Sequence, residues 1–423
     1  MAQGFKNVSK ILVIFKMSEY KKTLEYIHSL GMFSHSAGLG RITELLEVLG
    51  NPQKNLSGLH IAGTNGKGST AAMTAKALQC AGYKTGLFVS PFILEFRERI
   101  QINGEFITEA ALIRLAEKVK NTGIAVTEFE FITAVAFLYF SECKCDVCVI
   151  ETGLGGRLDA TNTLPAEFLP VITKIGLDHT AILGGTVEEI AAEKCGIIKG
   201  DRAVTCVGQN NGALGVIKSK ARRLIVPDGF QLRCVSCDIL GNRFVYKGRR
   251  YETALGGEYQ VQNALTAIEA LYEFAPSIPY EAVFEGLKNA TFPARLEVVS
   301  QTPLTVLDGA HNPDGAEALC EAMRPFDGKI TAIVGMMRDK SVDEFLRLTL
   351  PMCKDVVAVR AADNKRSLSA EEMADAAGKY CKNIITAQST AQAVIKARSL
   401  SKDNPIFIFG SLYLAADIRN EFI

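Results

Sequence analysis

The sequence predicts an α/β protein in which a doubly wound, P-loop-type N-terminal domain is followed by a smaller, Rossmann-like α/β C-terminal domain. Three observations predict this fold. Short apolar runs alternate with stretches of helical periodicity, a glycine-rich segment joins one such run to a helical stretch, and the alternation starts again after Pro293. In such folds ligands bind beyond the carboxyl ends of the parallel strands, so polar residues at those ends are candidates for function.

The elements are expected in the following order. Apolar residues recur at helical spacing over 20–49, interrupted by a Gly- and Ser-rich stretch at 33–40, which indicates helix, loop and helix. The first domain then has expected strands at 58–62, 84–89, 146–150 and 171–175, and helices at 69–80, 129–139 and 187–194. Residues 202–253 are richer in strand patterns, and 259–274 returns to helix. Strands of the second domain are expected at 304–307, 329–334, 356–361 and 405–409. We place the domains at 1–293 and 294–423.

Composition is ordinary for a globular enzyme of two or three domains, with 423 residues, 48% hydrophobic and 22% charged. The net charge of +1 gives no electrostatic reason to expect nucleic acid as a partner. The apolar run at 8–15 is too short to cross a bilayer, and residues 1–16 are expected to be peripheral or poorly ordered. We therefore expect a cytoplasmic protein that acts on small molecules as a monomer, away from membranes.

Cysteine usage points to a reducing compartment. The chain has eleven cysteines, an odd number without the spacing of a disulfide framework, so free thiols are expected. Cys143, Cys145 and Cys148 lead into a buried strand, where cysteine serves as a small hydrophobic residue. Cys234 and Cys237 have C-x-x-C spacing but no second pair nearby, so a zinc site is not expected there.

A candidate phosphate loop spans Gly63–Thr70 (GTNGKGST), between an expected strand and an expected helix. Glycines let backbone N–H groups approach an anion, the helix N-terminus favours negative charge, and Lys67 adds a point charge for phosphates. The spacing departs from the common Walker A pattern, because Gly68 separates Lys67 from Ser69. A ligand-free glycine turn is the simpler alternative, but a lysine flanked by glycines before a helix favours nucleotide binding.

Acidic and histidine side chains end the following strands. Glu151 closes the run at 146–150, Asp178 and His179 follow the run at 171–175, and Lys194 lies in the next helix. Because these strand ends meet at one edge of an open sheet, Glu151 is a plausible magnesium ligand beside the phosphate loop. The simpler alternatives are a surface glutamate and a histidine that caps a turn.

Several motifs together resemble those of folylpolyglutamate synthase and its bifunctional relative, dihydrofolate synthase, in the Mur ligase superfamily. They occur in the family's order from about Tyr20 to the FGSLYL segment near Tyr413. The motifs are GTNGKGS, Ser90-Pro91, ETGLGGRLDATN, GLDHT followed by EEIAAEKCGIIK, FPARLEVV and LDGAHNPDGA. The resemblance implies an N-terminal ATPase domain, with the active site in the cleft between the two domains.

The resemblance also implies a role for each matching residue. Ser90 and Glu151 would hold one Mg²⁺ and His179 a second, while Lys194 matches a lysine that is carbamylated in the family. Lys67, His179 and Lys194 would be the catalytic residues. ATP would be bound by Asn65, Gly66, Lys67, Gly68, Ser69, Asn263, Arg295 and Asp308, with His311 close by.

The same resemblance implies a pterin site formed by Thr127, Leu158, Asp159 and Ala160, with Ala37–Leu39 as further candidates. The sequence departs from the family at two positions that bear on this site: Phe92 replaces a His after Ser-Pro, and Gly40 replaces a Glu. The catalytic loop matches, whereas the exact pterin substrate stays open.

The function implied is an ATP-dependent ligase that adds L-glutamate to folates through an acyl phosphate, and that also joins glutamate to dihydropteroate. A monofunctional enzyme and a Mur-like ligase that acts on another carboxylate are the enzymatic alternatives. A nucleotide-binding regulatory module is the alternative outside catalysis, and the motif LDGAHNPDGA in a second α/β domain argues against it.

Overall fold

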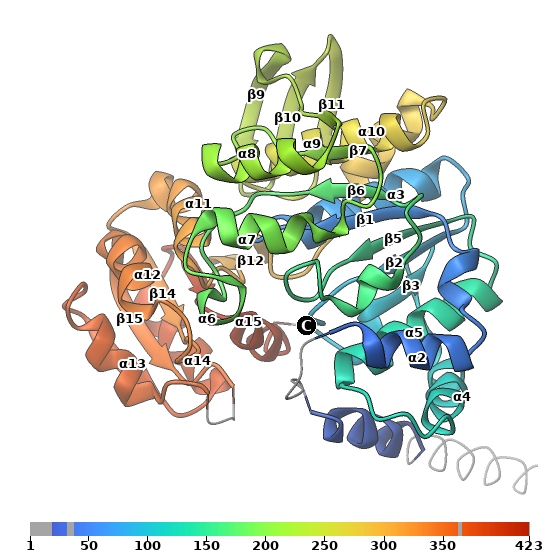
Figure 1. The fold of residues 1–423 in the computed structure, drawn as a ribbon. Helices are drawn as coiled ribbons and strands as arrows, with labels where there is room; N and C mark the ends of the chain where they lie inside the picture. Colours follow the sequence, from blue (N-terminus) through green and yellow to red (C-terminus); the bar gives the residue numbers. More distant parts are fainter. Residues whose placement is uncertain (1–18, 32–37, 363–365, 423) are drawn as a thin grey trace, which may run out of the picture.

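The computed structural model describes residues 19–31, 38–362 and 366–422, which form three sheets covered by helices (Figure 1). The expectations for residues 1–16, for the apolar run at 8–15 and for Ala37 lie outside the described residues. Residues 19–29 are helical, as the periodicity predicts. Among the described helices none is long and apolar enough to cross a membrane.

The largest sheet has eight strands in the order β4-β3-β2-β5-β1-β6-β7-β8. Six strands are parallel, while β3 and β4 extend one edge in antiparallel fashion. Every residue of β1 and β5 is buried, which explains why these strands read as continuous apolar runs. The bounds are β1 Gly58–Ala62, β2 Thr85–Phe88, β3 Ile100–Ile102, β4 Glu105–Phe106, β5 Val147–Glu151, β6 Leu169–Ile172, β7 Arg202–Thr205 and β8 Arg223–Ile225.

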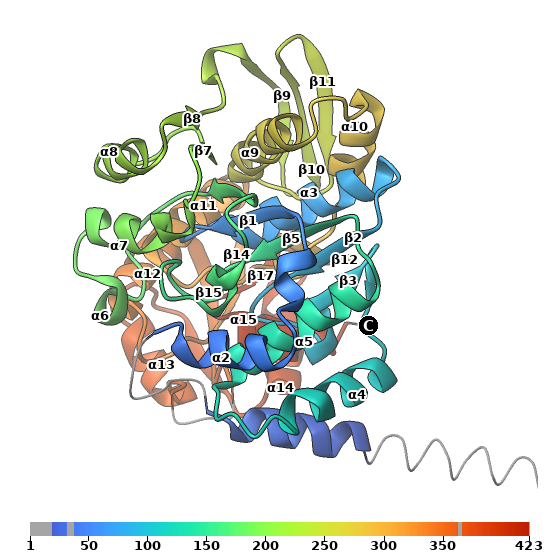
Figure 2. The ribbon, with the colours of Figure 1, turned by 45° about the vertical axis from the view of Figure 1, so that its right-hand side comes forward.

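Helices cover both faces of this sheet (Figure 2). On one face α3 and α9 share a hydrophobic core with β1, β5 and β6, and α10 packs on α3. On the other face α2, α4 and α5 share a core with β2 and β5. The helices are α2 Gly40–Val48, α3 Lys67–Cys80, α4 Glu109–Lys120, α5 Glu128–Glu142, α6 Thr180–Leu183, α7 Val187–Lys194, α8 Asn211–Lys220, α9 Glu258–Phe274 and α10 Tyr280–Asn289. Short 3₁₀ turns are η1 Pro52–Asn55, η2 Phe96–Arg99, η3 Ala160–Thr163, η4 Cys195–Ile197 and η5 Gly229–Gln231.

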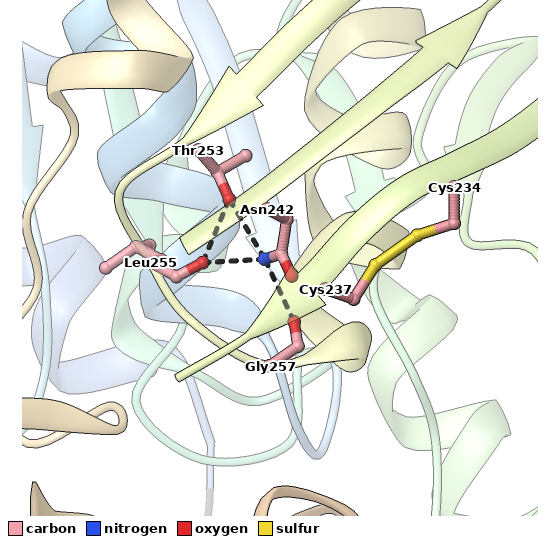
Figure 3. Close-up of a disulfide and its surroundings, with 6 residues drawn as sticks. All are labelled: Cys234, Cys237, Asn242, Thr253, Leu255 and Gly257. Carbon is pink, nitrogen blue, oxygen red and sulfur yellow. Dashed lines mark hydrogen bonds between the residues drawn. A yellow bond between two sulfur atoms is a disulfide. The ribbon is translucent and has the colours of Figure 1, made fainter. Parts of the chain in front are cut away.

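A small antiparallel sheet follows, in the order β11-β10-β9. Its strands are β9 Leu232–Asp238, β10 Gly241–Tyr246 and β11 Arg249–Thr253, within the region predicted to be rich in strands. The Asn242 side-chain amide donates to Thr253 Oγ1 and to the carbonyls of Leu255 and Gly257, at 3.1, 2.8 and 3.1 Å, which fixes the turn before α9 (Figure 3).

The expectation of free thiols is wrong for one pair of cysteines. Cys234 and Cys237, both exposed on β9, form a disulfide (Figure 3). Register with β10 shifts between these two residues, so the strand bulges there and brings the side chains together. The nine other cysteines are free, and Cys148 is buried within β5.

The third sheet has six strands in the order β12-β13-β17-β14-β15-β16. Only β12 is antiparallel to its neighbour among the strands described here. Helices α11, α12 and α13 cover one face, and α14 and α15 the other. The bounds are β12 Glu297–Gln301, β13 Leu304–Leu307, β14 Ile330–Val334, β15 Cys353–Val359, β16 Ile384–Ala387, β17 Ile406–Phe409, α11 Pro313–Met323, α12 Val342–Thr349, α13 Ala370–Ala377, α14 Thr390–Ser401 and α15 Leu412–Arg419; the 3₁₀ turns are η6 Arg324–Phe326 and η7 Leu350–Met352.

The six-stranded sheet contains two strands that the sequence pattern did not predict, β12 and the edge strand β16. Neither is fully buried, so their apolar signal is diluted by exposed positions. The two large sheets meet through a small apolar cluster of Ile93, Ala294 and Ala415. The predicted doubly wound fold with a smaller second α/β unit is confirmed.

Close packing of α10 on α3 gives a test of this arrangement. A Cβ added to Gly286 of α10 would overlap the backbone of Ala77 in α3, whereas one added to Gly215 of α8 would meet open space. We expect Gly286→Ala to lower the free energy of unfolding by about 1–3 kcal/mol, because the helices must separate. Gly215→Ala should raise it by about 0.5–1 kcal/mol, because alanine favours helix. Urea unfolding of both variants measures this, and a stabilised Gly286→Ala protein would contradict the packing.

Candidate active site at the junction of the two large sheets

The phosphate loop runs from the end of β1 to the start of α3. Gly66 caps α3 in a left-handed conformation, with φ of 87°. A side chain at Gly66 would collide with Asn263 of α9, and a Cβ at Gly68 would lie 2.5 Å from the ring of Phe292. Glycine is therefore required at both positions, because other segments lie directly on the loop backbone. The first N–H groups of α3 are left to face an anion.

Lys67 faces the end of β5. Its Nζ lies 3.4 Å from the carbonyl of Thr64 and 4.0 Å from Oε1 of Glu151. The Glu151 carboxylate is buried and accepts the backbone N–H of Ser90 at 3.1 Å. Burial raises the pKa of Glu151, and the Lys67 ammonium opposes that shift. The hydroxyl of Ser90 is buried without a hydrogen-bond partner, so it is available to a ligand beside Glu151.

Lys194 reaches the same loop from the end of α7. Its Nζ donates to the carbonyl of Gly63 at 2.7 Å, and the side chain is 4% exposed. Burial, together with repulsion from Lys67, lowers the pKa of Lys194 to about 7. Much of this amine is therefore neutral near pH 7, which gives it the lone pair that a nucleophile needs.

Asp178 joins the loop after β6 to the second large sheet. Its carboxylate accepts Lys340 Nζ at 2.7 Å and Asn312 Nδ2 at 3.4 Å, and His311 Nε2 lies 3.8 Å away. Burial opposes ionisation of Asp178, but His311 and Lys340 hold its pKa below the usual range. The neighbouring His179 is 40% exposed, and burial lowers its pKa to about 4, so its ring is neutral and able to bind a cation at pH 7.

A third group of residues comes from α9 and the segment before β12. Asn263 donates to Gln260, which donates to the hydroxyl of Ser69 at 3.1 Å, so α9 is tied to the phosphate loop. Asp308, buried at the end of β13, accepts the N–H groups of Leu296 and Ala310 at 2.9 and 2.8 Å.

Arg295 lies between these groups. Its guanidinium lies 5.8 Å from the centre of the Phe292 ring, the same ring that covers Gly68. Burial raises the pKa of Asp308, and the positive charge of Arg295 opposes this. Asn65 connects the phosphate loop to the second sheet directly, because its amide oxygen accepts Asn312 Nδ2 at 3.1 Å.

The residues predicted to bind a pterin lie at the start of α5 and on the loop that follows Glu151. Thr127 caps α5 in a reciprocal pair of hydrogen bonds with Glu130. The ring of Phe129, in the first turn of α5, lies against Gly153, which brings this helix end to the loop that carries residues 158–160. Leu158 is 38% exposed, whereas Asp159 and Ala160 are buried.

Sequence reasoning missed several residues of this junction. Lys340 follows β14 and Gln260 lies one turn before Asn263, both outside the quoted motifs, whereas Phe292 begins the FPARLEVV motif but had no predicted role. The position of Lys340 could have indicated its role. Its loop begins at the end of a predicted strand, where parallel sheets present ligand-binding groups. For Gln260 and Phe292 the signal is the close approach of their segments to the glycines of the loop, and only the folded chain contains it.

Comparison with known proteins identifies the family. Residues 294–412 match the family described as Mur ligase, glutamate ligase domain. The chain is 38% identical to the dihydrofolate synthase/folylpolyglutamate synthase of Bacillus subtilis, over 95% of this chain and 98% of that protein. It is 34% identical to the folylpolyglutamate synthase of Lacticaseibacillus casei, over 96% and 99%.

Solved structures agree. The folylpolyglutamate synthase of Mycobacterium tuberculosis complexed with ADP and AMPPCP superposes with a TM-score of 0.87 at 29% identity, covering 96% of this chain and 99% of that one. Escherichia coli FolC in complex with DHPP and ADP gives a TM-score of 0.83 at 29% identity, covering 95% and 97%. The chain therefore belongs to the dihydrofolate synthase/folylpolyglutamate synthase family of Mur-type ligases.

Proposed function

We propose that the protein is an ATP-dependent ligase that activates a folate carboxylate as an acyl phosphate and joins it to the amine of L-glutamate. The observation that carries this proposal is the junction itself. A phosphate loop with Lys67 and Glu151 faces Arg295 and Asp308, which come from the segment and sheet of the second unit. A nucleotide-binding regulatory module does not need two α/β units to meet at its phosphates. The boundary we propose at 293/294 agrees with the start of the glutamate ligase match and precedes β12.

The relatives support each substrate. The structures from M. tuberculosis and E. coli were solved with ADP, and the E. coli structure also with DHPP. By analogy, ATP would lie against residues 65–69, Asn263, Arg295 and Asp308. The pterin would lie by Thr127, Leu158, Asp159 and Ala160. The relative from B. subtilis, a dihydrofolate synthase/folylpolyglutamate synthase, supports dihydropteroate as a second substrate. Ala37–Leu39 are further candidates for the pterin site. Of these, the structure describes Gly38 and Leu39, which directly precede α2.

The chemistry follows from the charges at the junction. A carboxylate is a poor electrophile, so transfer of the terminal phosphoryl group of ATP to its oxygen provides a leaving group. Lys67 offsets charge on the phosphates, and the α3 N-terminus holds them in line with the acceptor. The glutamate amine then attacks the acyl carbon, and the tetrahedral adduct expels phosphate to give the amide. Asp178 and Asn65 contact residues of the second unit beside the phosphate loop, and these contacts would help to exclude water from the acyl phosphate.

The donor set fits magnesium. The unpartnered hydroxyl of Ser90 beside the Glu151 carboxylate provides two hard oxygen ligands next to the phosphates, and the neutral ring of His179 lies by Asp178. Ser90 and Glu151 would hold one ion and His179 a second. Magnesium at these positions supplies positive charge to the phosphate oxygens.

We also propose that Lys194 is carbamylated. A buried ammonium against a backbone carbonyl is costly unless it is paired, and the lowered pKa supplies the neutral amine that adds to CO₂. The carbamate would place a carboxylate-like group where the ammonium now lies, a short distance from the phosphate loop.

Lys67 tests the proposed reaction. Lys67→Ala should lower glutamate-dependent ADP release by at least about a hundredfold, because the phosphates lose their main cation. Lys76→Ala, on the same helix but away from the loop, is the matched control and should retain activity. Release of ADP and incorporation of labelled glutamate into dihydropteroate and tetrahydrofolate are measured in parallel. Incorporation into neither substrate by the wild-type protein would overturn the folate assignment.

Carbamylation of Lys194 is tested by chemical rescue. Lys194→Ala should be inactive because the carboxylate-like group is lost, and added formate should restore part of the activity by occupying the same space. Lys194→Arg keeps a cation and fills the space, so formate should not rescue it. Equal rates of Lys194→Ala with and without formate, both near wild type, would contradict a role for the carbamate.

The pKa of Lys194 predicts how stability depends on pH. Below about pH 7 the ammonium is protonated in both the folded and the unfolded states. Between about 7 and 10.5 the unfolded chain binds more protons, so stability rises with pH. From pH 7 to 9 the wild-type protein should gain about 2 kcal/mol relative to Lys194→Met. Urea unfolding in CO₂-free, magnesium-free buffer measures this, and parallel curves for the two proteins would contradict the lowered pKa.

A further inference from the structure

We propose that His60 is a positioning residue that orients Asp159, through the hydroxyl of Thr161, for binding of the pterin substrate. His60 lies in the middle of β1 and is 2% exposed, and its Nε2 lies 2.8 Å from Oγ1 of Thr161. Thr161, fully buried at the start of η3, lies 2.5 Å from Oδ1 of Asp159. This inference rests on the proposed function, because only that function places Asp159 in a pterin site.

The direction of each hydrogen bond follows from the donors present. Asp159 accepts backbone N–H groups of Gly153 and Leu154 on Oδ2, at 2.9 and 2.8 Å, and that of Thr161 on Oδ1, at 3.1 Å. Because the carboxylate is surrounded by donors, it can only accept hydrogen bonds. The Thr161 hydroxyl therefore donates its hydrogen bond to Asp159. That hydroxyl then needs a donor from His60. The imidazole must therefore carry its proton on Nε2 toward Thr161.

Burial supports the same assignment. Desolvation lowers the pKa of His60 to about 3, so the ring is neutral near pH 7. A neutral ring with its proton on Nε2 is a fixed donor rather than a charge, and it costs less to bury than an imidazolium. His60 therefore influences Asp159 through a directional hydrogen bond to Thr161 and not through a charge.

The chain of hydrogen bonds connects the two binding regions. β1 ends at the phosphate loop, and it pairs with β5, which ends at Glu151. Asp159 holds the turn that follows Glu151, through Gly153 and Leu154, and it lies between Leu158 and Ala160. Loss of the donor at His60 leaves the Thr161 hydroxyl without its second partner, so one of the four hydrogen bonds that orient Asp159 becomes weaker. The effect should fall on the pterin substrate and spare ATP, because the phosphate loop keeps its own contacts.

The test separates the hydrogen bond from the volume of the ring. His60→Gln places an amide N–H near the position of Nε2, whereas His60→Leu fills similar space without a donor. We expect His60→Leu to raise KM for dihydropteroate on the order of tenfold, as for a buried acceptor left unpaired, with KM for ATP within about twofold of wild type. His60→Gln should restore KM for dihydropteroate to within about threefold. Equal impairment of the Gln and Leu variants, or an equal rise in KM for ATP, would overturn the proposal.

Thr161 provides a second pair of variants in case His60→Leu does not fold. Thr161→Val removes the relaying hydroxyl and should repeat the His60→Leu defect, while Thr161→Ser keeps it and should behave as wild type. In the double variant His60→Leu/Thr161→Val the defect should be no larger than in either single variant, because both interrupt one chain. A wild-type KM for dihydropteroate in Thr161→Val, or additive defects in KM, would refute the relay.

One measurement does not depend on the substrate. In ¹⁵N-histidine-labelled wild-type protein, long-range ¹H–¹⁵N spectra report the tautomer of each of the five histidines, with His60→Gln to assign the resonance. We expect His60 to be neutral and protonated on Nε2. A proton on Nδ1 would overturn the relay even if folates are the substrate. The Nε2 tautomer in a protein that ligates no pterin would instead overturn the proposed function.

Discussion

The backbone of the phosphate loop lies directly against side chains from two other segments, and the rest of the site depends on this close approach. Asn263 of α9 lies on Gly66, and the ring of Phe292 lies on Gly68. Any Cβ at these positions would push the segments away, so the glycines serve packing as well as anion binding. Arg295, three residues beyond Phe292, lies over the same ring and so comes close to the phosphate loop, and α10 packs on α3 just before it.

Buried charge is the second constraint on the junction. Glu151, Asp308 and Lys194 are almost fully buried, and burial shifts the pKa of each toward its neutral form. Stability alone seldom explains why an ionisable group is buried, since an apolar residue at the same position costs less free energy of desolvation. A nucleotide with its cations would supply the missing partners. The unpartnered hydroxyl of Ser90 would gain a partner in the same way.

The two large sheets are connected at the site by polar contacts rather than by a broad apolar interface. Asp178 binds Lys340 and Asn312, Asn65 binds Asn312, and the apolar cluster between the halves is small. Polar contacts of this kind form and break at lower cost than a buried apolar interface. The arrangement suits a ligase, which must open to exchange substrates and close around a water-sensitive acyl phosphate.

The sequence by itself determined the fold class and the candidate phosphate loop. Apolar runs of strand length, the glycines around Lys67 and the strand-end position of Glu151 are local features, and the chemistry of each follows from its neighbours in the chain. Four strands at or near sheet edges, β3, β4, β12 and β16, escaped prediction because exposed or partly exposed positions dilute their pattern. Tertiary structure alone decided which distant side chains meet. Lys340 and Asp178 are 162 residues apart, and His60 and Thr161 are 101 apart. No periodicity records such pairings, because one joins loops of two different sheets and the other joins the middle of β1 to the turn η3 after β5. The Cys234–Cys237 disulfide likewise needed the bulge in β9, which the C-x-x-C spacing does not reveal.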